Sequence, residues 1–134
     1  MEEKRMKELE ACTITFLEGD VVHVHFKDGR TVLPEEVQAM FDTVEAARAG
    51  RKFLLMVSVG VGASLTNEAR VLASAEGSNR YIAADAIVVR DFGHQLAANV
   101  FVRHNKPGRP VGMFPDVPSA LAWLSQHHHL IDQP

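Results

Sequence analysis

The stretch from Tyr81 to Leu124, YIAADAIVVRDFGHQLAANVFVRHNKPGRPVGMFPDVPSALAWL, decides the fold. It predicts a buried strand at 86–89, an amphipathic helix at 92–104, a short basic loop containing Pro and Gly, and a second strand at 111–114. A closing helix follows, with Asp116 as its N-cap. These segments make up half of an α/β domain, and their residues are typical of structure rather than of catalysis.

The residues upstream of this stretch complete the alternation of strands and helices. Two alternating apolar runs, at 12–17 and 21–26, flank a Gly turn and predict a β-hairpin with one half-buried face. A helix is predicted from Pro34 to the stop at Gly50. The unbroken apolar run at 53–59 is typical of a central parallel strand covered on both faces, and a further helix follows it.

The order ββαβαβαβα predicts an α/β fold with a mixed, mostly parallel sheet, an N-terminal β-hairpin at one edge, and helices packed on the sheet. We expect three parts along the chain. Residues 1–10 are dense in charge and predict a flexible N-terminus. Residues 11–127 are expected to form a single domain, and residues 128–134 a C-terminal tail.

Bulk properties narrow the class of protein. The chain has 134 residues and a net charge of −3, which disfavours a general nucleic-acid binder. It has one cysteine, Cys12, so no intramolecular disulfide can form, as suits a reducing compartment. No signal peptide and no apolar run long enough to cross a bilayer is visible. We therefore expect a cytoplasmic protein without membrane insertion.

The element order resembles that of the STAS domains, the family of anti-sigma-factor antagonists and of the cytosolic tails of anion transporters. The segments ADAIVV, LAANVFVRHNKPGRPVGMF and SALAWL are similar to those of small bacterial proteins with a STAS-like or SpoIIAA-like fold. The resemblance implies a non-enzymatic regulatory or protein-interaction domain, which acts through a protein partner or as a homodimer.

In many STAS domains a Ser or Thr at the start of the helix after a central strand is the phosphorylated switch. The resemblance carries this role to Ser64 and Thr66, although the family's usual Asp-Ser pair is absent here. A phosphate there would face backbone N–H groups and the helix dipole. The alternative is that Thr66 is only an N-cap and Ser64 only a loop residue.

The same turn is a candidate anion site. Gly60 and Gly62 lie between a strand and a helix N-terminus, where α/β sheets bind ligands. Glycines there would let the backbone approach a phosphate. The alternative function is therefore a module that binds a small ligand, either a nucleotide or a lipid-like anion. The alternative is a tight turn without a ligand, which the sequence favours because GVGAS is neither a Walker motif nor a dinucleotide fingerprint.

A second candidate surface is the basic loop RHNKPGRP, whose cationic residues could hold a phosphate or an acidic partner. Solvated charge with no partner is the alternative. The candidate residues of this loop are Arg103, His104, Lys106 and Arg109.

The remaining polar residues indicate neither a metal nor a reaction. His23 and His25 share one face of a strand, but no further ligand pattern accompanies them, so they are expected to face solvent or a partner subunit. The three consecutive histidines at 127–129 are expected to fray. No nucleophile motif is present, and we expect no catalytic residues, no metal and no cofactor.

Overall fold

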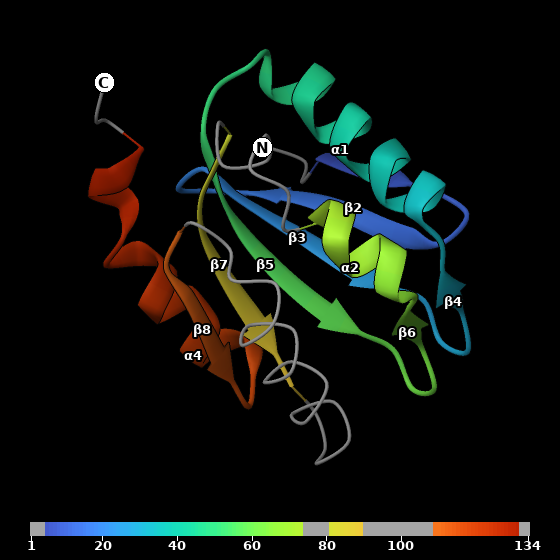
Figure 1. The fold of residues 1–134 in the computed structure, drawn as a ribbon. Coiled ribbons are helices and arrows are strands. Elements are labelled where there is room, and N and C mark those ends of the chain that lie inside the picture. The colour runs from blue at the N-terminus through green and yellow to red at the C-terminus, as the bar shows by residue number, and fades with distance from the viewer. Residues whose placement is uncertain (1–4, 74–80, 90–108, 132–134) are drawn as a thin grey trace.

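In a computed structural model, residues 5–73, 81–89 and 109–131 are described. Within them, the main sheet has six strands in the order β1-β2-β3-β5-β7-β8 (Figure 1). Antiparallel pairs join β1, β2 and β3, whereas β3, β5, β7 and β8 are parallel. The predicted mixed, mostly parallel α/β sheet is confirmed. The strands are β1 (Arg5–Glu8), β2 (Cys12–Leu17), β3 (Val21–Phe26), β5 (Phe53–Val59), β7 (Ile82–Val88) and β8 (Val111–Phe114).

Helices cover both faces of this sheet. The helices α1 (Pro34–Arg48) and α2 (Asn67–Ala73) pack on one face, and α4 (Val117–Ser125) packs on the other (Figure 1). Glu36 closes the first turn of α1, since its Oε1 accepts the backbone N–H of Leu33 at 2.9 Å. The predicted cap of the last helix is confirmed, because Asp116 Oδ1 accepts the Ser119 N–H at 2.8 Å.

The strand β5 lies at the centre of the core. Phe53 and Leu55 are buried towards α1 and α2, while Leu54 and Met56 are buried towards α4. This explains why its sequence does not alternate: both faces of a central parallel strand are covered, so both must be apolar.

Both ends of the chain differ from expectation. Residues 5–8, predicted to be part of a flexible N-terminus, form the edge strand β1, in register with β2 from Arg5–Phe16 to Glu8–Thr13. Its four residues are all exposed, so apolar burial gives no sequence signal for it. In the predicted tail, His128–Leu130 forms the short helix η2, and His128 Nε2 lies 2.9 Å from Asp20 Oδ2.

Two local features were also not predicted. A second, two-stranded sheet joins β4 (Thr31–Val32) to β6 (Ser64–Leu65), where only loops were expected. The strand β7 begins four residues before the predicted 86–89 and includes Asp85.

The predicted helix at 92–104 lies outside the described residues, as do Arg103, His104 and Lys106. No helix within the described ranges is both long and apolar enough to cross a membrane.

Candidate ligand pocket

An apolar pocket of about 290 Å³ lies on the face of the sheet that carries α1 and α2. The strands β5 and β7 contribute Val57 and Ile87 to its wall, and α1 contributes Met40 and Phe41. Ligand pockets in proteins are typically apolar cavities of roughly 300–1,000 Å³ with a few polar groups that fix orientation. The size therefore suits a small ligand.

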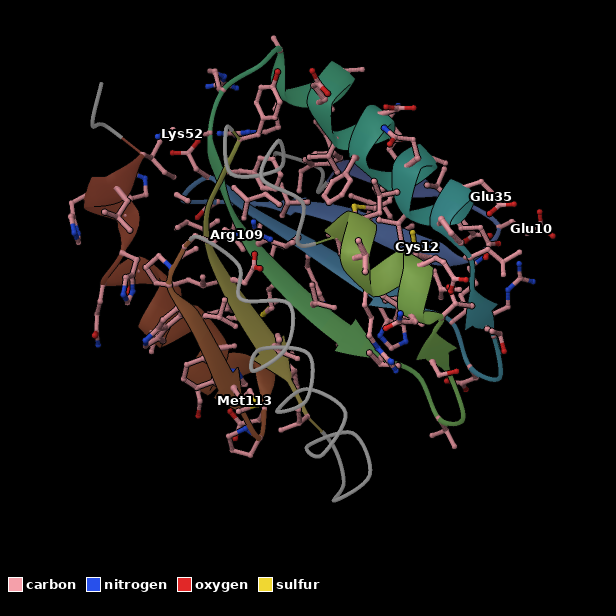
Figure 2. All side chains as sticks on the ribbon, in the orientation of Figure 1. Glu10, Cys12, Glu35, Lys52, Arg109 and Met113 are labelled. Atoms are coloured by element: carbon pink, nitrogen blue, oxygen red, sulfur yellow. The ribbon has the colours of Figure 1, made fainter. Side chains whose placement is uncertain are left out.

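The polar groups of this pocket include a buried ion pair between Asp85 of β7 and Arg109, which lies two residues before β8. Arg109 Nη2 lies 2.9 Å from Asp85 Oδ2, and the side chains are only 4% and 7% exposed. Arg109 Nε donates to the same oxygen at 3.0 Å, and Nη2 also donates to the Ala73 carbonyl at 3.3 Å. In Figure 2 the Arg109 side chain lies over the central strands. For Arg109, the alternative of solvated charge with no partner is therefore wrong.

The other carboxyl oxygen of Asp85 is without a partner. Within the described part of the chain, Oδ1 is buried and accepts no hydrogen bond. Burial raises the pKa of Asp85, and the charge and hydrogen bond of Arg109 oppose that rise. Buried polar atoms in folded proteins almost always have a partner, so this acceptor without a hydrogen bond is unusual.

In the turn at 60–66, the candidate anion site, most of the backbone donors already take part in intramolecular hydrogen bonds. Gly60 N–H donates to the Phe26 carbonyl at 2.7 Å, and Val61 N–H donates to Asp28 Oδ1 at 2.9 Å. The N–H groups of Ser64 and Thr66 likewise donate to carbonyls of the 30–32 segment. The glycine at position 60 is explained by crowding, since a Cβ there would lie 2.6 Å from the backbone N of Asp28.

The two hydroxyl candidates have different surroundings. Thr66 Oγ1 accepts the Ala69 N–H at 3.1 Å, so the interpretation of Thr66 as the N-cap of α2 is confirmed. Ser64 is exposed and also lines the pocket. The structure thus brings Ser64 and Arg109, from the two predicted surfaces, to one pocket, whereas Gly60 and Gly62 do not line it.

A second polar cluster lies on the opposite face of the sheet. His23 Nε2 and His25 Nδ1 approach Ser58 Oγ at 2.8 and 2.7 Å. Burial lowers the pKa of His23, and the nearby His25 lowers it further. Both histidines lie half-buried on β3 and contact Ser58 of β5, a pairing that the prediction of a face turned to solvent or to a partner subunit did not include. Among the described residues, no three His, Cys, Asp or Glu side chains are placed to hold a metal ion.

Sequence reasoning missed both Asp85 and Ser58 as site residues. Each is a single polar residue inside an otherwise apolar strand, IAADAIV and FLLMVSV. A lone polar residue in such a run must find a buried partner, and that was the available signal. Cys12 carries no comparable chemistry, because burial raises the pKa of its thiol to about 11.

Comparison with known proteins agrees with the fold. The fold is SpoIIAA-like: a solved structure of an uncharacterised protein of the DUF3478 family with a SpoIIAA-like fold, from Shewanella loihica PV-4, superimposes with a TM-score of 0.58. The two share 19% identity, over 92% of this chain and 98% of the other. Residues 15–128 match the family model DUF7793, described as a domain of unknown function, so the chain belongs to that family. None of the curated proteins matches the sequence.

Proposed function

We propose that this protein is a non-enzymatic regulatory domain that binds a small, largely apolar ligand in the pocket between the sheet and the helices α1 and α2. The observation that carries the proposal is the pocket itself: an apolar cavity of about 290 Å³ with a buried ion pair in its wall. A ligand that binds only the folded state stabilises it by mass action, by about 2.7 kcal/mol at one hundred times its Kd.

Two properties of the pocket favour binding over catalysis. The described lining residues include no histidine or cysteine, and Ser64 is their one hydroxyl side chain. The acid in the wall, Asp85, already pairs with Arg109. A nucleophile needs a base within hydrogen-bond reach, and this part of the wall supplies none.

The pocket is also connected to a surface that a partner protein could contact. Ser64 is exposed and belongs to β6, while Leu65 of the same strand lines the pocket. Thr66 caps α2 directly after β6. A ligand that packs against β6 would therefore act on the segment for which the STAS resemblance implies a regulatory surface. This proximity supports a domain in which ligand binding is transmitted to a partner.

A thermal-shift screen with a matched pair of variants tests the proposal. Val57→Phe adds a ring inside the pocket wall, whereas Val61→Phe makes the same change at a side chain that is 67% exposed. We expect a small apolar compound to raise the Tm of wild type and of Val61→Phe, but not that of Val57→Phe. A broad panel of small apolar compounds that leaves the wild-type Tm unchanged would contradict the proposal.

A second candidate function is self-association, and β1 supports it. Within the described sheet β1 is an edge strand with all four residues exposed, and edge strands offer unpaired backbone groups to another chain. We expect hydrogen exchange of the amides at 5–8 to slow as protein concentration rises, together with a doubling of the mass measured by light scattering. A constant monomer mass would exclude this homodimer.

A further inference from the structure

We propose that the ligand of this pocket is electrically neutral and carries a hydroxyl or N–H group that donates a hydrogen bond to Asp85 Oδ1. This inference rests on the proposed function and specifies its ligand class. It replaces the nucleotide or lipid-like anion suggested by the sequence.

The donor requirement follows from how Arg109 contacts the carboxylate. Both close nitrogens of Arg109 lie on Oδ2, at 2.9 and 3.0 Å, and so leave Oδ1 without a hydrogen bond. Asp85 is 5% exposed, which keeps bulk water from this oxygen. Asp85 lines the pocket, and we infer that a donor on a bound ligand supplies the missing bond.

The neutrality of the ligand follows from charge balance. The carboxylate of Asp85 and the guanidinium of Arg109 already compensate each other at 2.9 Å, and the third charged residue of the wall, Arg70, is engaged in an interaction of its own. An additional charge would leave water for a wall formed mainly by side chains such as Val57, Ile87 and Phe41. Transfer of an unpaired ion into such surroundings is strongly unfavourable, whereas one hydroxyl with a partner is tolerated.

The volume of the pocket and the hydrogen bonds of the turn at 60–66 also favour a small, neutral ligand. At about 290 Å³ the cavity is at the lower end of the range for drug-sized ligands. The N–H groups of Gly60, Val61, Ser64 and Thr66 are committed to intramolecular bonds, so they provide no cradle for a phosphate. A compact apolar body with one donor satisfies these conditions.

Three matched probes test the inference: 4-propylphenol, 4-propylanisole and 4-propylbenzoate. They share an apolar body, and their polar groups are a donor, an acceptor only, and an anion. We expect the phenol to bind with a Kd about tenfold lower than that of the anisole, the effect of one net hydrogen bond. We expect the benzoate to bind more weakly than either. Methyl NMR signals of Val57 and Ile87 should shift with the phenol, which locates the site.

A variant separates the donor bond from general apolar binding. The double substitution Asp85→Leu/Arg109→Met removes both charges together, which buried pairs often tolerate. We expect it to bind the phenol and the anisole equally. If the double variant retains the preference for the phenol, Asp85 is not the acceptor and the inference fails.

If the double variant does not fold, the titrations of the wild-type protein alone still test whether the ligand donates a hydrogen bond to Asp85. Equal binding of phenol and anisole would overturn the donor inference while the ligand-binding function stands. Tighter binding of the anisole would mean that Asp85 donates a proton, and would overturn it too. Binding of neither compound, with unchanged Val57 and Ile87 signals, would count against the pocket function itself.

Discussion

Arg109 and Asp85 form a one-sided ion pair: Nε and Nη2 of the arginine both lie within 3.0 Å of Oδ2, and the described residues leave Oδ1 without a partner. The pair ties the start of β8 to the middle of β7, and the bond to the Ala73 carbonyl ties both to the end of α2. The same contact thus links β7, α2 and the segment before β8, and it leaves an acceptor without a hydrogen bond at the pocket.

Removal of one partner of this pair is expected to destabilise the protein far more than removal of both. Asp85→Leu or Arg109→Met alone leaves a buried charge unpaired and should lower the free energy of unfolding by about 3–5 kcal/mol. The double variant should lie within about 1 kcal/mol of wild type. Urea unfolding followed by circular dichroism measures the three values.

The control for this cycle is the exposed ion pair between Lys27 and Glu8, at 3.6 Å. Lys27→Met should change the free energy of unfolding by less than about 1 kcal/mol, because solvent screens the pair. Single variants of Asp85 and Arg109 that are as mild as Lys27→Met would show that the pair is not buried in solution.

Gly60→Ala should destabilise the protein through crowding with the backbone of residue 28. A Cβ at position 60 would lie 2.6 Å from the Asp28 N and 2.9 Å from its Cα. Overpacking of this kind costs about 1–3 kcal/mol. Since backbone atoms of Asp28 obstruct this Cβ as well as Asp28 Oδ1, which lies nearest, Asp28→Ala should not fully restore stability in the double variant. Thermal unfolding measures both variants, and rescue by Asp28→Ala would locate the clash at the side chain instead.

Thr66→Val should lower the free energy of unfolding by about 1 kcal/mol, because it removes the oxygen that caps α2. Thr66→Ser keeps an oxygen and should lie close to wild type. Chemical unfolding compares the two. Equal losses in both variants would point to the methyl group of Thr66 rather than to its cap.

Ser64→Glu tests the proposed regulatory surface without disturbing that cap. Ser64 is exposed, so the substitution should leave the free energy of unfolding within about 0.5 kcal/mol of wild type. The added negative charge mimics part of the effect of a phosphate. We expect it to weaken capture of a partner protein from a host lysate relative to wild type, as measured by quantitative mass spectrometry. Undiminished capture would remove the switch role of Ser64.

His23 should make stability fall as the solution becomes acidic. Burial and His25 lower its pKa below the ordinary 6.5 in the folded state, so the unfolded chain takes up a proton first as pH falls. The stabilising contribution is present above pH 6.5 and is lost as pH falls from there through the folded pKa. His23→Gln, which keeps a donor for Ser58, should therefore lose less stability than wild type between pH 7.5 and 5.5.

The comparison between variants is needed because Asp85 acts in the opposite sense: its raised pKa adds stability as pH falls. Urea unfolding at the two pH values gives the difference. The exposed His129 is the control, and His129→Gln should follow the wild-type profile. A His23→Gln profile that coincides with wild type would show that His23 is not desolvated.

The sequence by itself determined the α/β class, the hairpin, the helix α1 and the double-sided burial of β5. Each depends on local periodicity or on caps such as Asp116, and these signals lie within a few residues of one another. The strand β1 had no such signal, because its exposed residues show no apolar pattern and its pairing with β2 alone defines it.

Only the tertiary structure decided the candidate site. Asp85 and Arg109 are 24 residues apart, and Ser58 is more than 30 residues from both histidines that approach it. Sequence placed Arg109 in a basic loop and the histidines at the surface, since charge and polarity favour exposure when no partner is known. A charged or polar side chain can be buried only when a partner from another part of the fold compensates its charge or completes its hydrogen bond. Strand order and register determine which residues come into contact, and both are properties of the folded sheet.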